Sequence, residues 1–163
     1  MDVVDQATRS RMMSGIKGKD TRPEILIRKG LHRLGFRYRL HGADLPGKPD
    51  LVFPKYHAVI FVHGCFWHKH DCHLFKWPST RKEFWRQKIE SNAARDERNV
   101  RQLEESGWKV LRIWECSIKG KRRRPIEEVI ATAANCLQFE MQSAEVAGID
   151  VQNHELPAAF SSD

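Results

Sequence analysis

The stretch PDLVFPKYHAVIFVHG, residues 49–64, decides the fold. Its second half, Ala58 to Val62, is continuously apolar and mostly β-branched, which is typical of a strand buried on both faces. The shorter run Leu51 to Phe53 predicts a partner strand, and Pro54 to Tyr56 separates the two. Two paired strands therefore carry Asp50 and His63 near their ends.

Patterns on both sides of this stretch predict helices packed on a mixed sheet. Thr21, Pro23 and Glu24 form a helix start with a capping box. The other expected elements are a strand over 36–40, a helix from a second capping box at Thr80 and Glu83 to Ser106, a strand over 108–114 and a helix from Pro125. The long helix is expected to bury Phe84, Ile89, Ala93, Val100 and Leu103. This order predicts an α/β domain.

Length and composition favour one folded domain. The chain has 163 residues, 40% hydrophobic and 30% charged, which excludes a disordered polar chain and a collagen-like one. We divide it into an arm (1–19), a folded domain (20–141) and an acidic, disordered tail (142–163). Because no apolar run approaches the roughly 18 residues of a membrane helix and the start lacks a secretion signal, we expect a soluble, cytoplasmic protein.

Charge is distributed unevenly along the sequence. All 28 Lys and Arg residues lie between Arg9 and Arg124, so the first 124 residues carry a net charge of +14, whereas residues 125–163 contain only acidic charges. Such an excess suits a polyanion, because cations placed on phosphates release condensed counterions. Nucleic acid is therefore the first candidate partner, and a solvated basic surface is the alternative.

The run HGCFWHKHDCH, residues 63–73, concentrates histidines and cysteines. Cys65, His70 and Cys72 offer three ligands of the kinds that zinc prefers. Cys116, which follows a predicted strand, is the better fourth ligand, and Cys136, within a predicted helix, is the alternative. A site closed by four protein ligands is structural, so we assign Zn²⁺ no part in the chemical step.

The turn KPD, followed by a strand that ends in FVH, resembles the metal-binding pattern of restriction-endonuclease-like nucleases. Phe61 and His63 stand where that pattern has an acid and a lysine. With this departure, the chain resembles the bacterial very-short-patch-repair endonucleases over about residues 5 to 120. The runs that carry the resemblance are LPGKPDLVF, VIFVHGCFWHKHDC, LFKWPSTRKEFW and GWKVLRIWEC. The resemblance implies a restriction-endonuclease-like mixed sheet flanked by helices. It also implies an enzyme that nicks double-stranded DNA 5′ of the thymine in a T:G mismatch, the product of 5-methylcytosine deamination.

The resemblance also implies roles for individual residues. Asp50 and the Val62 carbonyl would bind Mg²⁺, with Glu24 holding metal-bound water; the family usually has Thr at position 62. His68 matches the general base and His63 would lie at the phosphate, although which histidine is the main base stays open. The implied DNA contacts are an aromatic wedge of Phe66, Trp67 and Trp85, minor-groove contacts by Met13 and Ile16, and base contacts by Lys88 and Asn92.

Other interpretations of the same residues remain. A zinc-stabilised DNA-binding module without catalysis explains the charge, cysteines and aromatics, and a zinc hydrolase of small molecules would need an open metal position. Without the resemblance, Asp50 is a turn residue, Glu24 a helix cap and Trp85 a core residue. We expect a nucleoid-associated monomer, with mismatch-repair proteins as candidate partners. The basic run Lys119 to Arg124 favours phosphate contacts or a solvated loop.

Overall fold

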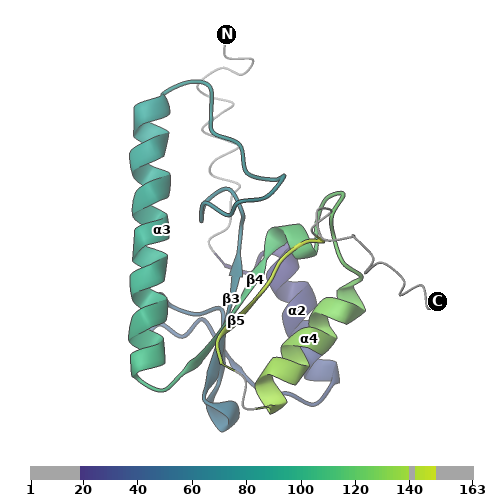
Figure 1. Ribbon diagram of the computed structural model, residues 1–163. Helices are drawn as coiled ribbons and strands as arrows, with labels where there is room; N and C mark the ends of the chain where they lie inside the picture. Colours follow the sequence, from purple (N-terminus) through teal and green to yellow (C-terminus); the bar gives the residue numbers. More distant parts are fainter. Residues whose placement is uncertain (1–18, 140–141, 150–163) are drawn as a thin grey trace, which may run out of the picture.

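The computed structural model describes residues 19–139 and 142–149 (Figure 1). Within these residues the strands are β1 (Arg39–Leu40), β2 (Leu51–Phe53), β3 (Ala58–His63), β4 (Lys109–Trp114) and β5 (Ala144–Val146). The α-helices are α2 (Arg22–Arg33), α3 (Lys82–Glu105) and α4 (Ile126–Gln138), and Pro54–Tyr56 and Glu115–Ser117 form short 3₁₀ helices. The predicted mixed α/β architecture is confirmed.

The strands form one sheet in the order β1-β2-β3-β4-β5. The β1–β2 and β2–β3 pairs are antiparallel, and the β3–β4 and β4–β5 pairs are parallel. In the parallel pair, His63 at the end of β3 lies opposite Trp114 at the end of β4. The residues that follow these two strands therefore leave the sheet at the same edge.

Side chains of β3 alternate between two hydrophobic layers, as predicted for a strand buried on both faces. Ala58 and Ile60 pack with α2 and α4, whereas Val59 and Phe61 pack with α3. Figure 1 shows the corresponding arrangement, in which α3 covers one face of the sheet and α2 and α4 cover the other. The edge of the sheet at His63 therefore lies between the beginning of α2 and the side of α3 that packs on the sheet.

The beginning of α2 follows the predicted capping pattern. The Thr21 hydroxyl accepts a hydrogen bond from the Glu24 amide at 3.4 Å, and the Glu24 carboxylate accepts one from the Asp20 amide at 2.9 Å. Glu24 therefore reaches one residue beyond the helix cap itself. The contact fixes the Glu24 side chain, which is 2% exposed.

The beginning of α3 differs from the sequence prediction. The helix starts at Lys82, and the residue at its N-cap position is Arg81, which has a positive φ of 50° and no side-chain cap bond, rather than the expected Thr80. Phe84 is 45% exposed, whereas Ile89, Val100 and Leu103 are buried as expected. The inner stripe therefore begins at Ile89, because the first turn of α3 extends beyond the sheet.

The end of the domain also differs from the expected division. Ala144–Val146, which we placed in the tail, forms β5 and pairs with β4, so the folded part extends beyond residue 141. Met13 and Ile16 lie outside the described residues. Among the helices that the structure describes, none has the length and apolar character needed to cross a bilayer.

Candidate active site and metal centre

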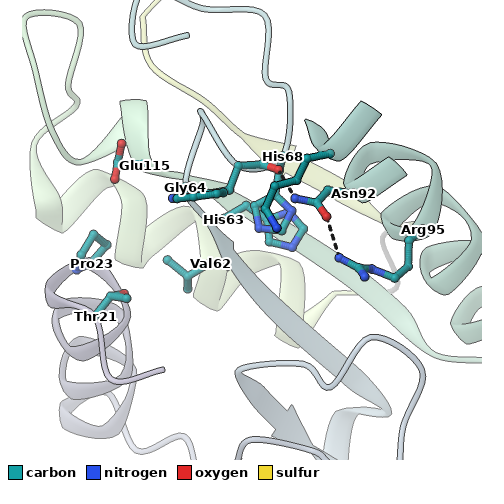
Figure 2. Close-up of a pocket in the computed structure, with 11 residues that line it drawn as sticks. Thr21, Pro23, Val62, His63, Gly64, His68, Asn92, Arg95 and Glu115 are labelled. Carbon is teal, nitrogen blue, oxygen red and sulfur yellow. Dashed lines mark hydrogen bonds between the residues drawn. The ribbon is translucent and has the colours of Figure 1, made fainter. Parts of the chain in front are cut away.

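A pocket of about 530 Å³ lies where the beginning of α2, the end of β3 and the inner side of α3 meet (Figure 2). The residues that line it are Thr21, Pro23, Val62, His63, Gly64, Trp67, His68, Lys88, Asn92, Arg95 and Glu115. Six of the predicted site residues therefore share one cavity, namely Val62, His63, Trp67, His68, Lys88 and Asn92.

Asp50 lies beside Val62, at the edge where β2 and β3 pair. Its carboxylate accepts a hydrogen bond of 2.7 Å from the Val62 amide. Burial raises the pKa of Asp50 to about 6, against the lowering effect of the Val62 amide, and the nearby charge of Glu24 raises it further. The structure thus brings Asp50, Val62 and Glu24 together, and the resulting excess of negative potential favours a cation.

His63 and His68 are stacked, with ring centroids 3.8 Å apart and an interplanar angle of 5°. Figure 2 shows the two rings side by side in the pocket. His63 is buried, and its burial lowers the pKa of the imidazole well below its usual range. Within the described residues, His63 Nδ1 has no hydrogen-bond partner. A buried, neutral imidazole stacked on a second one can accept or relay a proton.

Asp96 holds the second histidine, and sequence reasoning missed it. Its carboxylate lies 2.5 Å from His68 Nδ1. A proton held on Nδ1 by this carboxylate leaves Nε2 as the acceptor nitrogen of His68. The available signal was spacing, because Lys88, Asn92 and Asp96 recur every four residues and so share one helix face.

Asn92, expected at the DNA, has bonds within the protein. Its amide nitrogen donates to the Trp67 carbonyl at 3.1 Å, and its oxygen accepts from Arg95 at 2.8 Å (Figure 2). These bonds tie the loop after β3 to α3. Lys88 and Arg95 are the cationic side chains that α3 contributes to the pocket.

Glu24 belongs to a network that the sequence did not predict. Arg28 lies 2.7 Å from the Asp20 carboxylate and 3.4 Å from the Glu24 carboxylate. His41 Nε2 lies 3.3 Å from Asp20 and 3.7 Å from Glu24, and the His41 amide donates to the Asp50 carbonyl. The network therefore links the beginning of α2 to the strand edge that carries Asp50.

The predicted aromatic wedge residues form one cluster. Phe66 packs against Trp67 and Trp85, with centroid distances of 5.1 and 5.6 Å, and Trp67 lies 5.9 Å from Trp85. All three are partly exposed, so Trp85 is not a core residue. Phe75 and Phe84 extend the cluster against Phe66 and Trp85.

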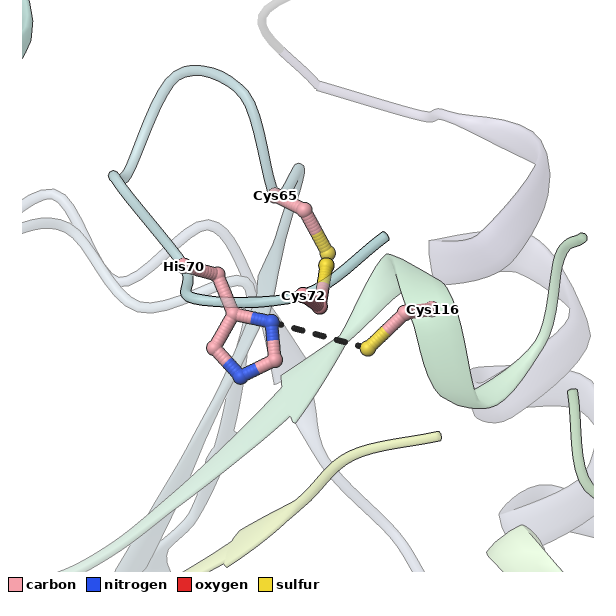
Figure 3. Close-up of side chains that lie close together, drawn as sticks. All are labelled: Cys65, His70, Cys72 and Cys116. Carbon is pink, nitrogen blue, oxygen red and sulfur yellow. Dashed lines mark hydrogen bonds between the residues drawn. The ribbon is translucent and has the colours of Figure 1, made fainter. Parts of the chain in front are cut away.

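The cysteines and one histidine gather next to this pocket. The donor atoms of Cys65, His70, Cys72 and Cys116 all lie within 4.8 Å of one another (Figure 3). The parallel pairing of β3 and β4 brings Cys116 there, whereas Cys136 packs against the core on α4. The structure thus decides between the two candidates for the fourth donor.

The electrostatics of this cluster suit a metal ion. A hydrogen bond from Cys65 lowers the pKa of the Cys116 thiol to about 4, and the same contact raises the pKa of Cys65. His70 Nδ1 lies 3.5 Å from the Cys116 sulfur. Three sulfur donors and one imidazole nitrogen form a set that fits a tetrahedral soft or borderline ion.

Comparisons with known proteins agree with this geometry. Residues 1–74 match the family described as DNA mismatch endonuclease Vsr. The chain is 43% identical to the DNA mismatch endonuclease Vsr of Escherichia coli over 145 residues, which cover 89% of this chain and 93% of the relative. It is 45% identical to the type II nicking enzyme V.XorIIP of Xanthomonas oryzae pv. oryzae over 117 residues, which cover 72% of this chain and 86% of the relative.

A further relative, the type II nicking enzyme V.NmeAIP of Neisseria meningitidis, is 44% identical over 120 residues, 74% of this chain and 86% of the relative. A mixed α/β sheet with a pocket at its edge that His63 and His68 line, together with these similarities, defines a DNA endonuclease. The chain belongs to the DNA mismatch endonuclease Vsr family.

Proposed function

We propose that this endonuclease requires Mg²⁺ and nicks double-stranded DNA 5′ of the thymine in a T:G mismatch, which starts very short patch repair. The observation that carries the proposal is that the buried acids Asp50 and Glu24 interact at the edge where Val62 lines the pocket, next to the stacked pair of His63 and His68 with its partner Asp96. In our proposal the sheet is the restriction-endonuclease-like core suggested by the sequence.

Asp50 and the Val62 carbonyl are the proposed ligands of Mg²⁺, with Glu24 holding its water. A hard cation prefers such oxygen ligands, and the main-chain ligand explains why a valine is compatible with the site. Bound Mg²⁺ supplies charge stabilisation at the scissile phosphate. Arg28 and His41 hold the Glu24 carboxylate toward Asp50.

His68 is the proposed general base. The Asp96 carboxylate keeps the proton of His68 on Nδ1, so Nε2 can accept a proton from the attacking water. The buried His63 ring limits the orientation of His68 by stacking on it and faces the same cavity. Of the two histidines, His68 is the one with a carboxylate partner, which favours it as the base.

We assign Zn²⁺ to the Cys65, His70, Cys72 and Cys116 cluster as a structural ion. Four protein donors complete a tetrahedral shell and leave no position for water, which argues against a zinc hydrolase. Two of these ligands flank the loop that carries His68, so the ion would stabilise the active-site loop itself.

Mismatch recognition is assigned to the partly exposed aromatics. Phe66, Trp67 and Trp85 would enter the duplex beside the mismatch, where opening a base step costs less than in paired DNA. Lys88 and Asn92 would contact the major groove, and Met13 and Ile16 of the arm the minor groove. Mismatch-repair proteins remain proposed partners, and a nucleoid-associated monomer the proposed state.

Replacing Asp50 by Ala tests the proposal against the DNA-binding module without catalysis. We expect Asp50→Ala to lower Mg²⁺-dependent nicking by at least 100-fold while mismatch binding is retained, measured by single-turnover nicking and gel-shift titration. Asp44→Ala is the matched control, because Asp44 is an exposed acid in the turn before Asp50 and, in the part of the chain that the structure describes, its side chain pairs with Arg39 at 3.8 Å. Nicking that persists in Asp50→Ala contradicts the assignment.

A further inference from the structure

We propose that residues 147–149, which follow β5, are a working part of the Cys65–His70–Cys72–Cys116 centre, with Gly148 as the residue that positions them. The inference rests on the proposed metal site and adds a component that lies more than 30 positions beyond its last ligand in the sequence. The segment holds one sulfur ligand by a hydrogen bond and covers the centre on one side.

The direct contact is between the backbone and a sulfur ligand. The Gly148 amide donates to the Cys116 sulfur at 3.2 Å. An amide that donates to a thiolate compensates part of its charge and fixes the direction of the sulfur, as carboxylates and carbonyls do for histidine ligands. Cys116 is itself buried, with 1% of its surface exposed, so few other donors can reach it.

Glycine is required at position 148 by the close approach of two backbone segments. A Cβ atom added there would lie 2.8 Å from the Cys116 carbonyl oxygen and 2.9 Å from the Arg122 carbonyl oxygen. Both atoms belong to the main chain, which cannot rotate away as a side chain can. Any other residue must therefore move the segment away from the cluster and lengthen the bond to sulfur.

Independent bonds hold the segment in this place. The Ile149 amide donates to the Arg122 carbonyl at 2.8 Å, and Arg124 Nε donates to the Ala147 carbonyl at 2.7 Å. On its other side, β5 pairs with β4 up to Val146, opposite Ile113. The contact with Cys116 is thus built into the fold at both ends of the segment.

The segment also forms a wall around the centre. A pocket of about 430 Å³ is lined on one side by His70, Cys72 and Cys116 and on the other by Arg122, Ala147, Gly148 and Ile149. This pocket gives a small chelator a path to the centre. Displacing the segment should therefore both weaken the hold on Cys116 and widen the path.

The experiment measures zinc release from the full chain. Zinc content is first measured by mass spectrometry, and release to the chelator pyridylazoresorcinol is then followed by absorbance. We expect Gly148→Ala to release zinc roughly tenfold faster or more, which is the usual effect of losing a group that supports a ligand. In Co²⁺-substituted protein, the sulfur-to-cobalt absorption band should move to longer wavelength, because the thiolate becomes the stronger donor.

Two further variants make the result specific. Glu145→Gln is the matched control on β5, where the side chain is 46% exposed and pairs with Arg112, and it should release zinc at the wild-type rate. Arg124→Gln removes the bond to Ala147 without adding an atom near Cys116, and it should accelerate release severalfold. It decides the question if Gly148→Ala does not fold.

The outcomes separate the two levels of the proposal. Wild-type protein that contains no zinc contradicts the metal assignment, and with it this inference. Zinc-containing protein in which Gly148→Ala and Arg124→Gln leave both the release rate and the cobalt band unchanged overturns the inference alone, because the segment would then be merely a neighbour of the site.

Discussion

At the scale of single residues, the surroundings of Asp50 disfavour the ionised form of its side chain. Its pKa is raised from 3.8 to about 6, chiefly by burial. The folded, metal-free protein therefore binds a proton on Asp50 more tightly than the unfolded chain does, between these two values. A divalent cation removes this penalty, so Asp50 couples cation binding to stability.

The first prediction follows from the raised pKa of Asp50. In the metal-free protein, ionisation of Asp50 should lower the free energy of unfolding as the pH rises from about 4 to about 6, by at most about 3 kcal/mol. Asp50→Asn should lose this part of the pH dependence, measured by urea unfolding in Mg²⁺-free buffer at several pH values. Mg²⁺ should raise the melting temperature more at pH 7 than at pH 5. Identical pH dependence in the two proteins contradicts the raised pKa.

Asp96 gives the second prediction. Asp96→Asn removes the carboxylate that holds His68, so single-turnover nicking should fall roughly 100-fold while mismatch binding and melting temperature change little. Glu105→Gln, an exposed acid on the same helix, is the control. Equal loss of binding and nicking would instead indicate that Asp96 supports the fold of the loop.

Sequence patterns predicted part of the site because some of its residues are neighbours in the chain. Cys65, His70 and Cys72 lie within eight positions, so their spacing alone suggests a metal site. Cys116 could be selected over Cys136 only through the β3–β4 pairing. Asp96 shares a helix face with Lys88 and Asn92, but a charged residue on a charged helix usually faces solvent, so neither Asp96 nor Arg28 stood out as a site residue.

At the scale of elements, the free backbone groups at the helix ends find their hydrogen-bond partners in different ways. Thr21 caps α2 through its side chain, whereas the carboxyl end of α4 is capped by a residue from the sheet. Lys109 of β4 donates to the carbonyls of Cys136, Leu137 and Phe139 at 3.0 to 3.2 Å. A cation at this end also favours the helix dipole.

The third prediction concerns this cap. Lys109→Met leaves the last carbonyls of α4 without their donor and should lower the free energy of unfolding by about 1–2 kcal/mol, measured by urea denaturation. Lys29→Met, at an exposed position of α2, should change it by less than about 0.5 kcal/mol. Zinc content should stay at the wild-type level in both variants. An unchanged stability in Lys109→Met would mean that water replaces the lysine.

Element prediction succeeded where the hydrophobic pattern was long and failed where it was short. The buried pattern of β3 and the helix that follows Pro125, α4, both appear as expected. β1 is reduced to Arg39–Leu40, and the three residues of β5 were hidden in an acidic segment. One acidic residue of this segment, Glu145 of β5, pairs with Arg112 of β4. Arg112 also pairs with Glu97 of α3.

At the scale of the whole molecule, the fold places three groups of residues around one sheet edge. Glu24 comes from α2 and Asp50 from the turn before β2, the histidines come from β3 and the loop after it, and Asp96 and the cations Lys88 and Arg95 come from α3. The aromatic cluster lies beside them on the same loop and helix. A mixed sheet with covering helices was predictable from element order, whereas the joint position of these groups required the topology.

The central claim is that this edge of the sheet cuts DNA at a mismatched thymine. The most direct measurement is a nicking assay in Mg²⁺ with end-labelled duplexes that differ only in one T:G mismatch within a methyltransferase-type site. The account predicts a single cut 5′ of the mismatched thymine and at least 100-fold slower cutting of the paired duplex. Tight binding of the mismatch without a cut in any divalent metal, or equal cutting of both duplexes, would contradict it.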